Sequence, residues 1–134
     1  MRIISGDLRG SALYVTKGKA TRPLKDMVRE SIFNLLIHSN KISFQLARSN
    51  VLDLYAGTGS FGLECLSRQA KNVYFVENEK FAFKTLKKNI EKLKLEKKTK
   101  IFFNDAFSII RKKNISQSKF NLIFCDPPFK NTNI

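Results

Sequence analysis

The sequence has few residues that bind metals or perform redox chemistry: two cysteines and one histidine among 134 residues. Cys65 and Cys125 form no C-x-x-C pair, and we interpret both as buried, reduced thiols. His38 has no second histidine to act with, which argues against a histidine metal site and against a histidine-centred triad. We therefore expect no metal.

Long apolar runs are also missing. No stretch approaches the roughly 18 apolar residues of a membrane span, and residues 1–6 lack the apolar core and cleavage site of a signal peptide. We expect a soluble, cytoplasmic protein that makes no membrane contact and is a monomer. The length and the 43% apolar content suit a single domain with a substantial core.

Acidic residues are scarce, with 11 against 25 basic residues and a formal net charge of +14. This excess favours a polyanionic partner, because Lys and Arg that neutralise phosphates release counterions. The 18 lysines fit the background of a chain rich in Asn, Ile and Phe, so for the lysine-rich face of residues 80–95 we favour a solvated surface over the alternative of a specific RNA site. Arginine is more informative, since four of the seven arginines lie within the first 29 residues: Arg2, Arg9, Arg22 and Arg29.

Residues 51–62, VLDLYAGTGSFG, carry the central structural signal, an apolar strand that leads directly into a glycine turn. Gly57, Gly59 and Gly62 have the G-x-G-x-x-G spacing, which lets the backbone approach a ligand at the carboxyl end of a parallel strand. Further strands are expected at 72–76, 99–103 and 120–125, and helices at 26–39, after the glycine turn to about Arg68, at 80–95 and through 107–115. This alternation from residue 50 onward predicts a parallel, doubly wound α/β sheet.

The region before the central strand has two predicted parts. Residues 1–17 favour a small β-hairpin with its turn at Gly10-Ser11, and residues 17–23 form a basic loop. The helix at 26–39 is expected to face the core with its apolar stripe, leaving Arg29 elsewhere on the helix; the stripe consists of Val28, Ile32, Leu35 and Leu36.

Three acids follow or end successive strands and bear on the cofactor. Asp53 stands beside the glycine turn, where it would repel a pyrophosphate but suits a cationic group such as the amino group of a methionine moiety. Glu77 is placed to accept hydrogen bonds from a ribose diol, and Asp105 from an adenine amino group. Together they favour S-adenosylmethionine over a dinucleotide, although singly Asp53 or Asp105 could cap a helix and Glu77 could be a surface acid.

The tetrapeptide Asp126-Pro127-Pro128-Phe129 is the most specific chemical signal. An exocyclic amino group on a base is a poor nucleophile, and hydrogen bonds to the Asp126 carboxylate and the Pro127 carbonyl would aim its lone pair at a sulfonium methyl. Two prolines fix the backbone direction, and Phe129 can stack on a base taken out of its helix. Catalysis would then rest on positioning and electrostatics.

The ordered set of motifs resembles the RsmD-type small-subunit ribosomal RNA guanine-N2 methyltransferases of bacteria. Its amino-terminal part consists of residues 1–6, Leu8-Arg9-Gly10, Thr21-Arg22-Pro23, Arg29-Glu30 and Phe33-Asn34, and its later part of residues 51–62, Val76-Glu77, Asp105-Ala106 and 126–129. The resemblance implies a Rossmann-like methyltransferase fold and methyl transfer from S-adenosylmethionine to a guanine N2 in ribosomal RNA of an assembled or assembling small subunit. It assigns the cofactor to Asp53, Gly57, Gly59, Glu77, Asp105 and Ala106, and the chemistry to residues 126–129. It implies that the hairpin and basic loop of residues 1–25, with Arg2, Arg9, Lys19 and Arg22, contact RNA, and that residues 26–134 form the cofactor-binding and catalytic core.

One departure from the family concerns the carboxyl-terminal part. Methyltransferases of this fold usually have seven strands, and the sequence ends five residues after Phe129, so we expect the last strands to be missing and the strand at 120–125 to lie at an apolar edge. The chain is then a fragment of a longer frame or a natural truncation. The alternatives are a truncated relic that binds RNA or cofactor without catalysis, a DNA adenine-N6 methyltransferase, and, least favoured, a nicotinamide dehydrogenase.

Overall fold

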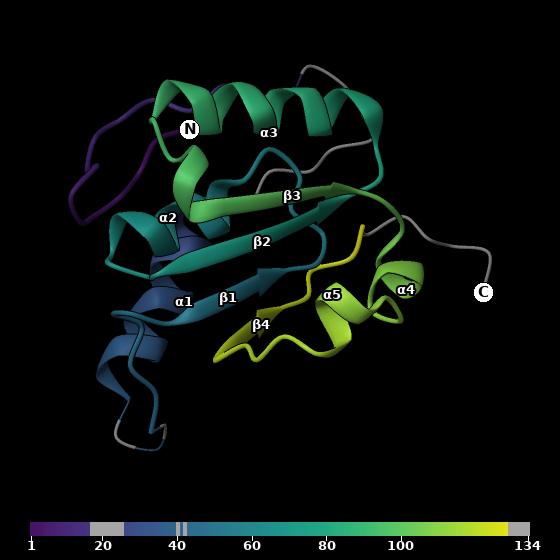
Figure 1. Cartoon of the computed structure of the whole chain (residues 1–134). Helices are drawn as coiled ribbons and strands as arrows, with labels where there is room; N and C mark the ends of the chain where they lie inside the picture. Colours follow the sequence, from purple (N-terminus) through teal and green to yellow (C-terminus); the bar gives the residue numbers. More distant parts are fainter. Residues whose placement is uncertain (17–25, 40, 42, 129–134) are drawn as a thin grey trace.

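Four parallel strands form the centre of the structure, in the order β3–β2–β1–β4 (Figure 1). The computed structural model describes residues 1–16, 26–39, 41 and 43–128. The strands are β1 (Asn50–Asp53), β2 (Asn72–Glu77), β3 (Thr99–Phe103) and β4 (Leu122–Phe124). The predicted parallel α/β sheet is confirmed.

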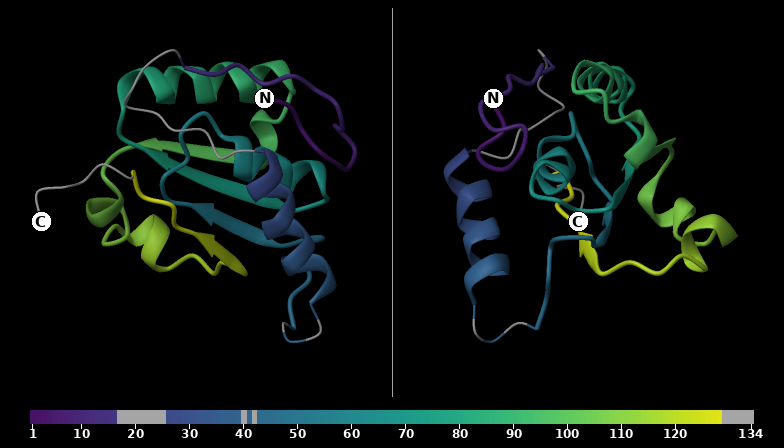
Figure 2. Two further views of the ribbon diagram at one scale, coloured as in Figure 1. Left: turned by 180° about the vertical axis from the view of Figure 1, so that it is seen from behind. Right: turned by 60° about the vertical axis from the view of Figure 1, so that its left-hand side comes forward.

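Helices cover both faces of the sheet (Figure 2). One face packs against α1 (Asp26–His38), α2 (Ser60–Ser67) and α3 (Lys80–Lys92), and the other against two short helices, α4 (Ala106–Ile109) and α5 (Lys113–Ser116); a 3₁₀ turn, η1 (Glu96–Lys98), precedes β3. None of the helices in the described ranges is long and apolar enough to cross a membrane.

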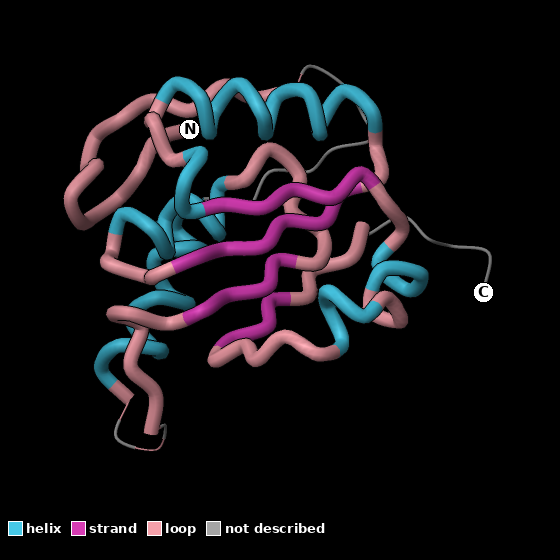
Figure 3. Tube along the Cα trace, in the orientation of Figure 1, coloured by secondary structure: helices cyan, strands magenta, loops and turns pink. Residues whose placement is uncertain are grey.

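The two inner strands carry the core. Val51, Leu52, Val73 and Phe75 are at most 3% exposed, as expected for strands that are covered on both faces. β4 lies at an edge of the described sheet, as the sequence predicts, and Ile123 on it is 57% exposed. Figure 3 shows how short β4 is beside the inner strands.

The glycine turn joins β1 to α2 as predicted. Gly57 and Gly59 have φ values of +60° and +95°, which residues with a Cβ rarely adopt, and Gly59 is the N-cap of α2. Gly62 serves packing instead, since a Cβ there would lie 2.3 Å from Cε1 of Phe75. The third glycine of the motif therefore lets α2 approach β2 closely.

Gly62→Ala is expected to lower the free energy of unfolding by about 1–3 kcal/mol, the cost of overpacking a filled core. The Phe75 ring is fully buried and cannot move away. Urea denaturation of the single variant and of Gly62→Ala/Phe75→Leu would test the contact, because the smaller Leu side chain should recover part of the loss. A loss that Phe75→Leu does not relieve would contradict the packing argument.

The predicted apolar stripe of α1 is half confirmed, since Ile32 and Leu36 pack against the core whereas Val28 and Leu35 do not. The buried residues of α1 are Arg29 and Phe33, whereas Val28 is 45% and Leu35 59% exposed. The prediction uses apolar periodicity alone. Arg29 takes part of the inner face of α1 because its guanidinium bonds backbone carbonyls there. The Phe33 ring stacks on Phe61 of α2 with centroids 4.9 Å apart, which fixes the helix on that face.

The amino-terminal hairpin is less regular than predicted. Within residues 1–16 a single antiparallel bridge joins Arg2 and Ala12, and neither arm forms a strand. Backbone hydrogen bonds from Ile3 N to Ser11 O (2.9 Å) and from Leu13 N to Met1 O (2.8 Å) hold the two arms together. Ile3 and Leu13 are buried because the segment packs on the helices, so its apolar alternation serves the core rather than a ladder.

The single helix predicted through residues 107–115 is two helices, α4 and α5. Ile109 and Ile115 both enter the core cluster of Leu52 and Val76. Residues six apart lie about 120° apart around one continuous helix, so the break near Lys112 allows both to face the sheet. The cysteine prediction holds only for Cys65, where burial raises the thiol pKa; Cys125 is free but exposed, because it follows the edge strand.

Candidate functional site

The predicted acids lie at one edge of the sheet. In the strand register Asp53 is level with Phe75 and Phe124, and Glu77 with Phe103. Asp105 and Asp126 follow β3 and β4 by two residues each. The carboxyl ends of four parallel strands therefore bring the four carboxylates to the same side of the molecule.

Asp53 is the most unusual of these acids. Its side chain is buried, and in the described part of the chain neither carboxylate oxygen has a hydrogen-bond partner. Burial raises the pKa of Asp53 from 3.8 to about 7, and the charges of Glu77 and Asp126 raise it further; the Gly62 amide lies near enough to lower it, although its geometry falls short of a hydrogen bond. An unpaired carboxylate in such a place suits a cationic ligand group, since burying it alone is costly.

Glu77 holds the glycine turn in place. Its Oε1 accepts a hydrogen bond from the Gly57 amide at 2.7 Å, and its Oε2 accepts one from the Glu79 amide at 2.9 Å. Glu79 in turn caps α3 by accepting from the Phe81 and Ala82 amides. Glu77 is thus tied to the turn and to the start of α3, and is more than a surface acid.

Asp105 is the N-cap of α4, the simpler alternative that the sequence left open. Its Oδ2 accepts from the Ser108 amide at 3.1 Å, and Ala106 behind it is buried. Tyr55, which sequence reasoning missed, lies within electrostatic reach: burial raises its pKa, and Cys125 and Asp105 act in the same direction. The sequence did contain a signal for Tyr55, because the residue lies just after the central strand, where the acids of the site are also found.

The tetrapeptide follows β4, and Phe124 fixes its start. The Phe124 ring stacks on Phe61 of α2 at a centroid distance of 3.8 Å and an interplanar angle of 9°. Its carbonyl accepts from the Leu54 amide at 3.0 Å, which joins the ends of β4 and β1. Asp126 is half-buried and Pro127 and Pro128 are exposed, while Phe129 lies outside the described residues.

The basic residues assigned to RNA divide into two pairs. Arg2 and Arg9 are exposed and line one open cleft of about 440 Å³, which Asp26 and Glu30 of α1 also line. The cleft therefore has both signs of charge. Lys19 and Arg22 lie outside the residues that the structure describes.

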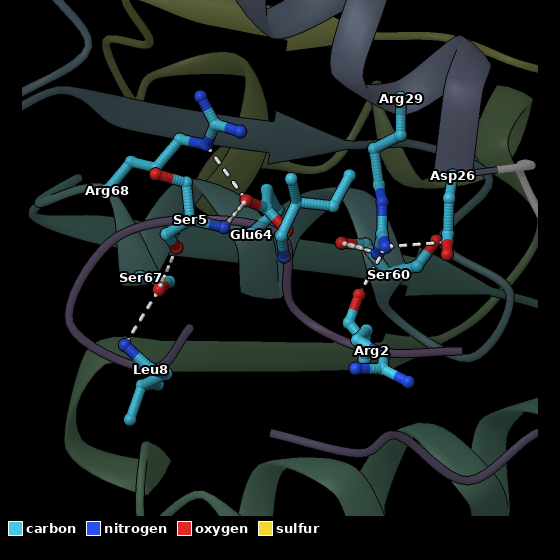
Figure 4. A network of polar contacts seen from close by, with 10 residues as sticks. Arg2, Ser5, Leu8, Asp26, Arg29, Ser60, Glu64, Ser67 and Arg68 are labelled. Carbon is cyan, nitrogen blue, oxygen red and sulfur yellow. Dashed lines mark hydrogen bonds and ion pairs between the residues drawn. The ribbon is translucent and has the colours of Figure 1, made fainter. Parts of the chain in front are cut away.

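Buried polar residues that the sequence analysis did not single out attach the amino-terminal segment to α2 (Figure 4). Glu64 is fully buried, and its carboxylate accepts from the amides of Ile4 (2.8 Å) and Ser5 (3.0 Å) and from Nε of Arg68 (2.8 Å). Ser67 Oγ donates to Ser5 O at 2.6 Å. A lone acid in the otherwise apolar helix after the glycine turn was a usable signal for Glu64.

Arg29 attaches α1 to the same network. Its guanidinium donates to the carbonyls of Ser60 (3.4 Å) and Arg2, and pairs with Asp26 at 3.0 Å. Burial lowers its pKa, an effect that Glu64 and Asp26 oppose. The buried Arg29 therefore positions the start of α2, where the glycine turn ends.

Asn89 of α3 joins the glycine turn to the amino-terminal segment. The side chain is fully buried; its amide nitrogen donates to Thr58 O (2.9 Å) and Tyr14 O (3.1 Å), and its Oδ1 accepts from the Tyr14 amide (2.8 Å). A polar residue on the apolar face of Leu86 and Ile90 was the signal in the sequence. Asn89 thus holds the turn at the Thr58 carbonyl, next to the Gly57 amide that Glu77 holds.

The chain is similar in sequence to several known proteins. The model of the family described as conserved hypothetical protein 95 matches residues 1–134. The chain is similar to Bacillus subtilis YlbH, a protein named as a candidate rRNA methyltransferase, with 38% identity over 130 residues, covering 97% of this chain and 67% of the relative. It is also similar to the Haemophilus influenzae protein named ribosomal RNA small subunit methyltransferase D, with 39% identity over 129 residues and coverage of 96% and 64%.

The chain is also similar to a solved structure. A candidate methyltransferase of Escherichia coli superposes with a TM-score of 0.81 at 34% identity, covering 100% of this chain and 67% of that one. The chain thus spans about two thirds of the length of these relatives.

Proposed function

The chain belongs to the conserved hypothetical protein 95 family, and on that premise we propose that it transfers a methyl group from S-adenosylmethionine to the exocyclic N2 of a guanine in small-subunit ribosomal RNA. The names of its relatives support the substrate class. We propose further that it acts as a monomer, in the cytoplasm, on an assembled or assembling small subunit.

The observation that carries the proposal is the buried, unpaired carboxylate of Asp53 beside the glycine turn. It would hold the positively charged amino group of the cofactor, while Glu77 would accept from the ribose hydroxyls. Gly57 and Gly59 keep the backbone open for the methionine part, and Asp105 with Ala106 would receive the adenine. A dinucleotide fits less well, because Asp53, Glu77 and Asp126 would repel its pyrophosphate.

In the proposed reaction the main role of the protein is to orient the guanine amino group and the cofactor. When bound, the sulfonium supplies an electrophilic methyl group. Asp126 and the Pro127 carbonyl would accept hydrogen bonds from the guanine N2 amino group and so direct its lone pair along the axis of displacement. Transfer of the methyl group to N2 would leave the cofactor as a neutral thioether, and the proton that N2 loses would pass to solvent.

Tritium transfer from labelled S-adenosylmethionine into unmethylated small subunits tests the proposal. We expect label in the ribosomal RNA, and within it at a guanine N2 on nucleoside digestion. Duplex DNA with unmethylated adenines is the competing substrate. Label in DNA but not in subunits, or no transfer while the cofactor binds, would contradict the proposed function.

A further inference from the structure

The amino-terminal segment runs beside α3 in the opposite direction. Lys92 Nζ donates to Ala12 O at 2.6 Å, Asn89 bonds both backbone groups of Tyr14, and Thr16 Oγ1 donates to Thr85 Oγ1 at 3.1 Å. As the segment advances from 12 to 16, its partners on α3 therefore recede from 92 to 85. Since α3 begins three residues after Glu77, the segment leads toward the edge of the sheet that carries the acids.

Two adjoining open hollows lie between the segment and α3, and together we call them the α3 groove. One, of about 350 Å³, lies nearer the acids and is lined by Val15, Thr16, Phe81, Lys84, Thr85 and Lys88. The other, of about 510 Å³, is lined by Tyr14, Lys88, Glu91 and Lys92. Lys88 lines both hollows, so they are neighbours along the helix.

The charge of the α3 groove is mainly positive. Lys84 and Lys88 are exposed, have no ion pair within the described part of the chain, and stand one helical turn apart on the same face. Among the described residues Glu91 is the only acid that lines the groove, and Lys92 is engaged with Ala12 and the Tyr14 ring. Like charges at this spacing destabilise a helix slightly, and a bound polyanion would reverse that effect.

Aromatic rings accompany the lysines. Tyr14 is 51% and Phe81 62% exposed, and each lines one of the two hollows. Exposed rings next to lysines, along a groove that leads to the reacting edge, are what a single-stranded nucleic acid needs: cations for its phosphates and flat faces for its bases. From sequence alone a solvated surface is favoured over an RNA site for the lysine face. The amino-terminal segment beside α3 adds the second side of the groove and the exposed Tyr14 ring.

We propose that a single-stranded stretch of the substrate RNA next to the target guanine binds in the α3 groove. Lys84 and Lys88 contact its phosphates, and Tyr14 and Phe81 stack on its bases. Asn89 connects this groove to the glycine turn, so the strand passes close to the cofactor site. The inference rests on the proposed function for the identity of the RNA, but its test does not require methyl transfer.

The test is binding of a fluorescent, unstructured single-stranded RNA oligonucleotide, followed by anisotropy over a series of KCl concentrations. Lys84→Ala/Lys88→Ala should weaken binding by roughly tenfold and reduce the slope of log K against log salt by about 1.4, or about 0.7 for each lost phosphate contact. Phe81→Ala should weaken binding by about fivefold or more and leave the slope unchanged. The melting temperature of the double lysine variant should not fall, because alanine favours the helix and the repulsion is gone.

The matched control is Lys97→Ala/Lys98→Ala, which removes the same charge from η1, beyond the carboxyl end of α3, where neither lysine lines the groove. Equal effects of the two lysine pairs would mean general attraction to a basic protein and would overturn the groove. Tighter binding of duplex RNA than of the single strand would overturn the assignment to single-stranded RNA. Wild-type protein that binds RNA in this way but does not methylate subunits would contradict the proposed function and leave the α3 groove standing.

Discussion

Asp126→Ala should reduce methyl transfer by on the order of 10²–10³-fold, the usual cost of removing one preorganised polar group from the reacting centre. The carboxylate is the group we expect to hold the guanine amino group, so its loss affects the reacting geometry. Cofactor affinity should change by no more than a few-fold. The loss should therefore appear in kcat.

Labelled methyl transfer and cofactor titration on the same preparation separate the two effects. Asp126→Asn is the matched variant, because it preserves the shape and one accepting oxygen, and we expect it to retain more activity than Asp126→Ala. The stack of Phe124 on Phe61 should hold the backbone in both variants. Equal loss of cofactor binding and of transfer would show that Asp126 is structural.

The local signals in the sequence predicted the sheet well. Strand β3 and the start of α1 were predictable because each has an apolar pattern within its own residues. The glycine turn was predictable because its conformations require glycine at Gly57 and Gly59. The order of the acids along the chain then placed them at one edge, since parallel strands end together.

What could not be predicted depends on partners far away in the sequence. Arg29 faces inward because it donates hydrogen bonds to the Ser60 and Arg2 carbonyls, and no pattern within the sequence of α1 indicates these partners. Asp105 caps α4 in the structure, and the sequence alone could not choose between that role and a ligand contact. The lysine face of α3 shows the same limit, because its neighbouring segment lies about 70 residues earlier in the chain.

The second large effect concerns Asp53. Its folded-state pKa of about 7 lies above the ordinary value of 3.8, so between these values the folded protein holds a proton that the unfolded chain has released. The contribution of Asp53 to the free energy of unfolding therefore falls as the pH rises from about 4 to 7, and its full cost is present above 7. At 1.36 kcal/mol per unit the cost of ionising the buried group is roughly 4 kcal/mol.

Asp53→Asn removes this cost, because the amide has a similar shape and no charge to bury. Without cofactor, we expect the variant to gain stability over the wild type as the pH rises from about 4 to 7, with a gain of up to roughly 4 kcal/mol at pH 8. Urea denaturation at a series of pH values measures the difference between the two proteins, in which the titration of carboxylates that do not interact with Asp53 cancels.

The same substitution should weaken cofactor binding, and the pH dependence identifies the cause. A cationic amino group requires the ionised carboxylate, so wild-type affinity should rise about tenfold per pH unit below 7 and level off above it. Asp53→Asn should bind weakly and without that rise. A wild-type cofactor affinity that does not change with pH across this range would show that the Asp53 charge does not bind the cofactor. A rise in affinity with pH, together with a more stable Asp53→Asn variant, would mean that the protein keeps a destabilising carboxylate in order to bind its ligand.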